Sequence, residues 1–321
     1  MKAKLNVQMK PAADTFCAAV KSMLDFLGDE HPLWEIEGLS GYAFRILVHR
    51  EACPSGTHHT NWKKLHPRTL RRLGWEPRFA LHFDWDRAGS LASRRPEVIE
   101  LINSSIDDGR PVTVYDLYVP EWAMATGYND AERKLQVETF LNLAHWKTVP
   151  YDKLGDFNLP VLYALDAGKR LENYDREAAY REALSVANQH YNLQEYTWRP
   201  TVHDGKDAYD QWLSTLKEYP NRTCMPEGMA DYSAKFGEWR TSASRFCREA
   251  AKMFPDIKTH LEAAAHDFGE EAKAFGSLAK LFPAPGGGGI DKAKVAHALI
   301  LVQKAQAYYN AAIANMRSAR L

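Results

Sequence analysis

The chain has no net charge that would direct it toward a charged partner. Its 41 Lys and Arg residues are balanced by 41 Asp and Glu residues, so no long-range field attracts nucleic acid or an anionic membrane. The basic segment 63–72 is typical of a solvated helix face. No apolar run approaches the ~20 residues that span a bilayer, and residues 1–8 lack the apolar core of a signal peptide. We therefore expect a cytoplasmic protein without nucleic-acid or membrane partners.

Cysteine is scarce, and the common metal-binding and phosphate-binding motifs are missing. The four cysteines, at positions 17, 53, 224 and 247, form no Cys-x-x-Cys pair, which is typical of free thiols in a reducing compartment. The adjacent His58 and His59 have no third ligand at a zinc-site spacing. The glycines at 286–289 lack the Lys-Ser/Thr that completes a phosphate-binding loop. The sequence predicts neither a metal nor another cofactor.

Aromatic residues are abundant, with 9 Trp, 15 Tyr and 13 Phe. They can build a large core, and they also suit a pocket for a sizeable organic ligand. The hydrophobic pattern divides the chain into two parts. It changes between helical and alternating periods up to about residue 168 and is helical afterwards. We predict an α+β domain over residues 1–168 and an all-helical domain over residues 169–321.

The first part contains signals for helices and for an antiparallel sheet. Residues 15–27 place apolar side chains at helical spacing between a suitable N-cap, Asp14, and a suitable stop, Gly28. Further helices are predicted over 67–73 and 96–106. Strands are predicted at 42–49, 112–119, 122–128, 135–141 and 160–165. The polar turn that follows the third of these strands has the length of a hairpin loop, which favours antiparallel pairing.

Cys17 is the strongest single candidate for a reactive group. It falls in the first turn of the predicted helix, where unsatisfied N–H groups and the helix dipole favour a thiolate. The helical wheel places it at the edge of the apolar stripe, at the border between core and cleft. The nearby Asp14 carboxylate opposes a thiolate, and free cysteines are commonly buried structural residues. Position alone leaves a catalytic and a structural cysteine both open.

Several segments together resemble papain-like peptidases of the bacteriocin-leader-processing type. Residues 14–28, which begin Asp-Thr-Phe-Cys and end Leu-Gly, are similar to the opening helix of these enzymes. Residues 109–114, Gly-Arg-Pro-Val-Thr-Val, resemble their Gly-x-Pro-Val strand. Residues 121–130, Glu-Trp-Ala-Met-Ala-Thr-Gly-Tyr-Asn-Asp, resemble their His-Trp-Val-Val-Val-x-Gly-Tyr-Asp-Asp strand and turn.

Within this group the chain is most similar to the butirosin biosynthesis protein H N-terminal-like proteins. The segments 38–46 and 53–56 also look like theirs. The resemblance covers about residues 10–165 and implies a papain-like α+β domain with an antiparallel sheet, followed by a helical region.

The resemblance also implies a site in which the activating residues are replaced. A papain-like site pairs its thiol with His, orients that His with Asn or Asp, and uses Gln as an oxyanion donor. Glu121 stands at the position of the family's His, the orienting acid falls near Glu138, and Pro11 stands at the position of the Gln. A carboxylate can accept a thiol proton, but it cannot stabilise a thiolate as imidazolium does. His145 is the first other histidine that could serve as the base.

Two functions follow as expectations. The first is a cysteine-dependent acyltransferase or amide hydrolase acting on a small molecule or peptide, with Cys17 as nucleophile, Glu121 as base and Glu138 behind it. The second is a papain-like pseudoenzyme that binds a small molecule or peptide in the retained cleft, where Glu121 would hold an amine or hydroxyl group. The residues expected to line the cleft are Asp14, Tyr42, Trp122 and Tyr128. The sequence does not determine the oligomeric state.

Overall fold

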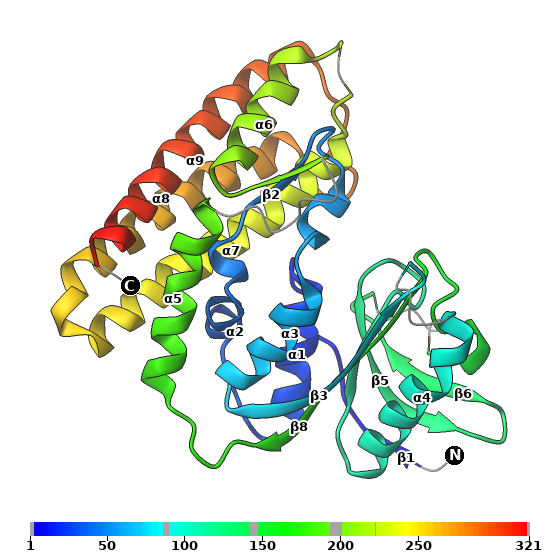
Figure 1. Cartoon of the computed structure of the whole chain (residues 1–321). Coiled ribbons are helices and arrows are strands. Elements are labelled where there is room, and N and C mark those ends of the chain that lie inside the picture. The colour runs from blue at the N-terminus through cyan, green and yellow to red at the C-terminus, as the bar shows by residue number, and fades with distance from the viewer. Residues whose placement is uncertain (1–2, 86–89, 142–146, 193–200, 222, 320–321) are drawn as a thin grey trace. The chain divides into compact units, whose positions relative to one another are not determined.

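The chain forms two compact units (Figure 1). The computed structural model describes residues 3–85, 90–141, 147–192, 201–221 and 223–319. The first unit comprises Met1–Ile36 and His66–Tyr174, and the second comprises Glu37–Leu65 and Asp175–Leu321. The architecture is α+β with antiparallel sheets, as the sequence predicts.

A seven-stranded antiparallel sheet is the framework of the first unit. Its strand order is β3-β8-β4-β5-β6-β7, and β1 pairs with β5. The strands are β1 (Ala3–Lys4), β3 (Trp75–Phe83), β4 (Val112–Tyr115), β5 (Trp122–Asn129), β6 (Lys134–Glu138), β7 (Thr148–Pro150) and β8 (Val161–Arg170). The last four strands predicted from the sequence correspond to β4, β5, β6 and β8. The strand β3 was not predicted.

Helices pack against both faces of this sheet. On one face, α4 (Leu91–Asp107) places Val98 and Ile102 against strand residues such as Val137. On the other, α1 (Thr15–Phe26) packs against β4 and β5, and Phe16 meets Trp122 edge to face. Because neighbouring strand residues point to opposite faces, each strand contributes to both layers of the core.

Local sequence explains where α1 begins and where a predicted strand fails. The Asp14 side chain caps α1, and Gly28 follows the helix with a φ of 77°, so this helix is confirmed.

The strand predicted over 42–49 is wrong in its first half. Tyr42–Phe44 forms a 3-10 helix, and only β2 (Leu47–His49) is extended. The residue before the 3-10 helix, Gly41, has a φ of 81°, which interrupts an extended backbone.

The second unit is mainly helical. Its helices include α5 (Arg176–Asn192), α6 (Gly205–Glu218), α7 (Pro226–Met253), α8 (Lys258–Leu281) and α9 (Lys292–Ser318). Figure 1 shows α7, α8 and α9 as long neighbouring helices, and α8 packs against both of the others. Within the described part of the chain, none of the helices has the length and apolarity needed to cross a membrane.

A small sheet makes the predicted all-helical description too simple. The strand β2 pairs antiparallel with β9 (Val202–Asp204) in the second unit. Each of these short strands satisfies backbone groups of the other. Three residues are too few to produce a clear alternating pattern, so periodicity did not indicate β9.

The division between the units differs from the predicted boundary after residue 168. The first unit ends at Tyr174, and the segment Glu37–Leu65 belongs to the second unit. Within that unit the Tyr232 hydroxyl of α7 donates to the carbonyl of Cys53 at 2.7 Å and accepts from the N–H of His49 at 2.9 Å. Hydrophobic periodicity indicates the type of an element but not the neighbour against which it folds.

A buried ion pair lies in the core of the second unit. Arg240 of α7 donates from Nε to Oε1 of Glu271 on α8 at 2.7 Å, and both side chains are 0% exposed. Its Nη1 donates to the carbonyls of Ala43 at 2.7 Å and Arg45 at 2.9 Å. The Tyr209 hydroxyl of α6 also donates to Glu271. The network therefore connects three helices and the segment that precedes β2.

Candidate functional site

Cys17 lies in the first turn of α1, and its side chain is fully buried. The Asp14 carboxylate accepts a hydrogen bond from the Cys17 N–H, with 2.7 Å between Oδ1 and N. Cys17 is 0% exposed and Asp14 is 5% exposed. All residues from Thr15 to Val20 are buried, so the covered surface of α1 is wider than a one-sided apolar stripe. The border position expected from the helical wheel is therefore not an exposed one.

The chain before β5 brings Glu121 to the start of α1. The Thr15 hydroxyl donates a hydrogen bond to the Glu121 carboxylate and accepts one from the N–H of Trp122 at 3.3 Å. The Glu121 carbonyl accepts from the N–H of Asp116 at 3.1 Å, which holds the turn before β5. The start of the helix and the start of the strand thus meet. The N-terminal end of α1 therefore has two carboxylates beside it, that of Asp14 and that of Glu121.

An aromatic cluster fills the space between the start of α1 and the sheet. Phe16 stacks on the His66 ring with centroids 3.8 Å apart. Trp122 meets Phe16 at 5.6 Å and also contacts the rings of Tyr115 at 4.7 Å and Tyr163 at 6.4 Å. None of these five side chains is more than 4% exposed. Trp122, predicted to line a cleft, is packed here within the core.

His66 is a residue that the sequence reasoning missed. Its Nδ1 lies 2.8 Å from the Tyr163 hydroxyl. Burial raises the pKa of Tyr163 well above its usual value, so the phenol keeps its proton and engages one ring nitrogen of the histidine. His66 belongs to α3 (Trp62–Arg72), which was interpreted as a solvated basic helix. Leu65, Thr69 and Leu70 share its helical face and are also buried, so the periodicity of this stripe could have identified it.

Opposing electrostatic effects meet at the start of α1. The helix N-terminus stabilises an anion by about 0.3–1 kcal/mol at exposed sites. A carboxylate acts in the opposite direction, because its negative charge repels a thiolate. Asp14 and Glu121 both stand at this end of the helix.

Glu138 has its own partner at the end of β6. Its carboxylate forms an ion pair with Lys147, with 2.5 Å between Oε2 and Nζ. In the sheet, Glu138 lies opposite Met124 of β5. It is therefore beside the strand that follows Glu121, and its charge is balanced locally.

Tyr128 lies on the face of the sheet opposite to Trp122. The two residues are an even number of positions apart, so an unbroken strand would place them on one face. The pairing of β5 with β6 shifts register between Ala125 and Gly127, and such a bulge reverses the alternation. Tyr128 joins the core beneath α4 and donates to Oδ1 of Asp107 at 2.8 Å. The structure does not bring Tyr128 to the start of α1.

The Tyr128–Asp107 contact predicts an alkaline loss of stability. The hydrogen bond to Asp107, together with burial, raises the pKa of Tyr128 to about 12 from a usual value of 10.0. The folded chain then holds a proton that the unfolded chain releases, so this stabilisation is complete below pH 10 and is lost as the pH rises toward 12. In urea unfolding, Tyr128→Phe should be less stable than wild type at pH 8 and should lose stability less steeply between pH 10 and 12. Equal slopes for the two proteins would contradict the prediction.

Tyr42 belongs to the second unit and packs within it. Its hydroxyl lies 3.2 Å from Oγ1 of Thr60, and its ring lies 5.2 Å from that of Trp239 on α7. The residue is 2% exposed. It is part of the core of its own unit.

The other cysteines differ in their exposure. Cys53 is partly exposed, and its sulfur lies 3.2 Å from Oγ of Ser55. Cys224 and Cys247 are buried. Burial raises the pKa of Cys224 to about 12 and also raises the pKa of Cys247. Cys53 is therefore the appropriate accessible reference for any measurement of thiol reactivity.

No metal centre is found at those histidines considered from the sequence that lie in the described part of the chain. His58 is in the second unit, where its Nε2 lies 3.2 Å from Nζ of Lys235. His145 lies outside the described residues. Across residues 3–85, 90–141, 147–192, 201–221 and 223–319, no group of three or more His, Cys, Asp or Glu side chains is arranged to hold a metal ion.

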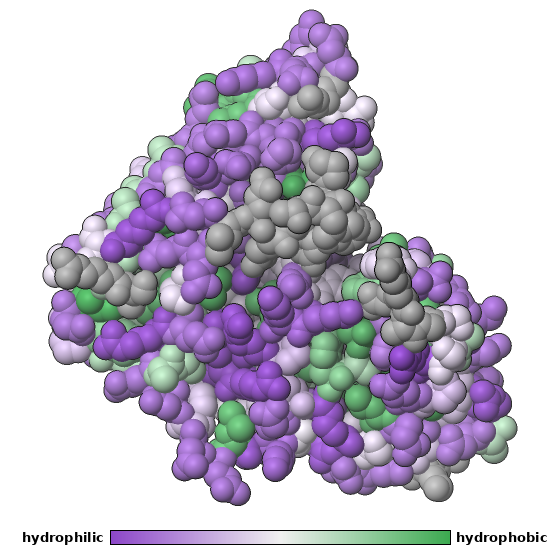
Figure 2. Space-filling model, in the orientation of Figure 1, coloured by the Kyte–Doolittle hydropathy of each residue, from purple (hydrophilic) through white to green (hydrophobic). Residues whose placement is uncertain are grey.

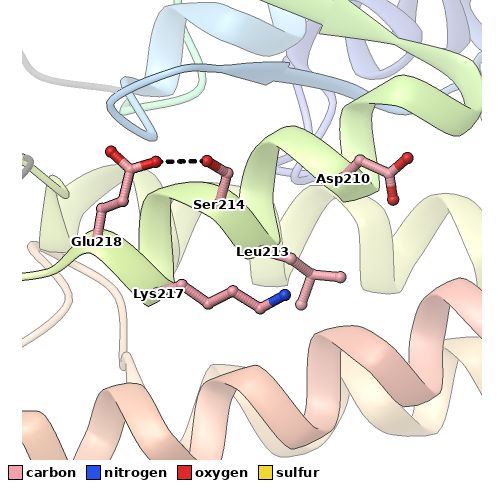
Figure 3. Close-up of a pocket in the computed structure, with 5 residues that line it drawn as sticks. All are labelled: Asp210, Leu213, Ser214, Lys217 and Glu218. Atoms are coloured by element: carbon pink, nitrogen blue, oxygen red, sulfur yellow. Dashed lines mark hydrogen bonds between the residues drawn. The ribbon is translucent and has the colours of Figure 1, made fainter.

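A depression of about 410 Å³ lies along α6 in the second unit (Figure 3). It is lined by Asp210, Leu213, Ser214, Lys217 and Glu218. The Ser214 hydroxyl donates to Glu218 at 2.7 Å. All lining residues come from a single helix, and none of them is a residue predicted for the site.

Comparison with known proteins does not identify a relative. No protein-family model matches the chain, and no curated protein matches it.

Proposed function

We propose that the first unit is a papain-like binding module that has lost cysteine catalysis and holds an amine-bearing small molecule or peptide through Glu121. The support for a papain-like fold is the arrangement of one helix and one sheet. A helix with a cysteine in its first turn packs on an antiparallel sheet, and the strand that begins after Glu121 meets the start of that helix at Thr15.

The observation that carries the proposal is the hydrogen bond from Thr15 to the Glu121 carboxylate. It holds a second carboxylate at the start of α1, beside the capping Asp14. This arrangement suppresses a thiolate at Cys17 and attracts a cation to the same place. Glu121 is partly exposed, whereas Cys17 is buried. Glu121 is thus the more exposed of the two residues.

A cysteine-dependent acyltransferase or amide hydrolase remains the second candidate because of His66. Its ring stacks on Phe16, the residue before Cys17. In that mechanism, His66 would take the proton of the Cys17 thiol, and the thiolate would attack the acyl carbon of an amide or ester. The C–N or C–O bond would break, the leaving amine or alcohol would take the proton from His66, and a thioester would remain. Transfer of the acyl group to an amine or to water would complete the reaction.

Binding of a simple amine distinguishes these candidates. Spermidine titrated calorimetrically at low salt should bind the wild-type protein, and Cys17→Ala should bind it equally well. Glu121→Gln keeps an acceptor for Thr15 but removes the charge, so its affinity should fall about 10- to 100-fold, since a charge-assisted hydrogen bond contributes about 1.5–3 kcal/mol.

Glu138→Gln is the matched control, because it removes one carboxylate from the same sheet at a place already neutralised by Lys147. It should leave the affinity unchanged. Loss of affinity in Cys17→Ala, or equal losses in both glutamine variants, would overturn the proposal.

A further inference from the structure

Exposed large hydrophobic side chains gather at one end of the sheet in the first unit. The described part of this unit has four exposed large hydrophobic residues. Three of them lie at this end of the sheet: Trp85, which is 52% exposed, Leu141 at 43% and Leu159 at 41%. Phe26, the fourth, lies at the other end of α1. The surface seen in Figure 2 is mostly hydrophilic, with hydrophobic residues in small separate areas. Trp85 and Leu159 are the neighbouring pair among the three, because Phe83 of β3 pairs with Val161 of β8, whereas Leu141 follows β6 on the other side of β5.

A chain of hydrogen bonds connects this sheet end to Glu121. The N–H of Asp84 donates to the Pro160 carbonyl at 3.1 Å, which places Trp85 beside the Leu159 segment. The N–H of Leu159 donates to Oδ2 of Asp116 at 2.6 Å. The Asp116 N–H in turn donates to the Glu121 carbonyl at 3.1 Å. We call residues 83–85, 116–122, 139–141 and 157–161 the rim.

The rim is held in place before any ligand arrives. Asp116 is 1% exposed and has a φ of 58°, a conformation that is uncommon for a residue with a side chain. Its carboxylate accepts from the backbone and the side chain of Asn158, at 3.0 and 2.7 Å, as well as from Leu159. Phe83 stacks on Trp85 with ring centroids 4.6 Å apart. A preorganised surface loses little conformational entropy on binding.

The rim is acidic as well as apolar. Its four segments contain no Lys or Arg. Of their acidic residues, Asp84 is exposed and Glu121 is partly exposed, whereas Asp116 is buried. Trp85 is on the chain that continues β3, and Glu121 precedes β5; β8 and β4 lie between these two strands. Three strand spacings of about 4.8 Å separate them by about 14 Å, which an extended peptide spans in about four residues.

We infer that the rim binds an extended peptide in which a basic residue and a large apolar residue are about four positions apart. This inference rests on the proposed amine site at Glu121. The basic side chain pairs with Glu121, and the apolar side chain packs on Trp85 and Leu159. The charge complementarity and the spacing of the two anchors favour this occupant.

Fluorescence anisotropy of a labelled probe peptide tests the inference. The probe is a heptapeptide, Ser-Lys-Thr-Leu-Thr-Phe-Ser, with fluorescein at its C-terminus. It should bind the wild-type protein, and Trp85→Ser combined with Leu159→Ser should weaken it at least tenfold. The control variant is Phe26→Ser, which also replaces an exposed hydrophobic residue of the first unit by serine. It should bind the probe like the wild-type protein. Equal weakening by both, or no binding to wild type, would overturn the inference.

Spermidine separates this inference from the proposed function. If spermidine binds through Glu121 while the peptide does not respond to the rim substitutions, the inference fails and the amine site stands. If spermidine fails to bind, the amine site itself fails, and the inference fails with it. Sedimentation with phosphatidylglycerol vesicles provides the remaining comparison. Vesicle binding that is lost in the rim variant, without peptide binding, would identify a lipid surface as the occupant and overturn the inference.

Discussion

Replacement of Arg240 by methionine is expected to lower the free energy of unfolding of the second unit by about 3–5 kcal/mol, the cost of breaking a buried ion pair. The guanidinium and the Glu271 carboxylate are both 0% exposed. Methionine would leave the carboxylate without its cation and would remove the donor from the carbonyls of Ala43 and Arg45. Burial already raises the pKa of Glu271 with Arg240 present, and loss of the guanidinium should raise this pKa further.

The double variant Arg240→Met with Glu271→Leu is the control for this prediction. It removes both charges, and uncharged residues of similar volume often replace a buried pair at little cost. The double variant should therefore be more stable than Arg240→Met alone in urea unfolding followed by circular dichroism. A double variant as unstable as the sum of the two single variants would show that the charges do not act as a pair.

Replacement of Phe16 by alanine is expected to cost about 3–5 kcal/mol of stability in the first unit, because it removes a large buried ring. Phe16 is 0% exposed and contacts both His66 and Trp122. Its loss would open a cavity between α1 and the sheet. Urea unfolding of the variant and of the wild type measures the difference.

Phe16→Leu keeps most of the volume and should cost clearly less than Phe16→Ala. Phe26→Ala removes the same side chain from an exposed position on the same helix, and we expect a change within about 0.5 kcal/mol. A small effect of Phe16→Ala, similar to that of Phe26→Ala, would mean that α1 is not docked through this ring.

Much of the secondary structure could be predicted because it depends on local patterns. The helix after Asp14 has its cap, its apolar spacing and its glycine stop within one short segment, and it forms as α1. The strands from 112 to 165 alternate clearly or are continuously apolar, and they form β4, β5, β6 and β8. The strand β3 was missed because Pro77 interrupts its pattern. In the structure β3 is an edge strand, with a register shift between Glu76 and Arg78, where a proline can be accommodated.

The site was harder to predict because its composition depends on non-local packing. The bulge in β5 cannot be recognised from its own sequence, so Tyr128 was expected on the face that Trp122 occupies. The burial of His66 depends on Phe16 and Tyr163, which are far from it in the sequence. Tyr42 was assigned to the first domain, although its segment folds with the second unit. The prediction that Glu121 lies near the start of α1 rested on the family resemblance and not on a local pattern.

The pH dependence of Cys17 alkylation tests most directly whether this thiol has lost its activation. The protein is treated with iodoacetamide from pH 6 to pH 10, and each cysteine is quantified by peptide mass spectrometry. We predict that Cys53 reacts first and that Cys17 reacts slowly at neutral pH, as Cys224 does, because two carboxylates and full burial oppose its thiolate. Fast labelling at pH 6 that is selective for Cys17 over Cys53 would contradict the binding-module proposal and would favour a cysteine enzyme with His66 as its base.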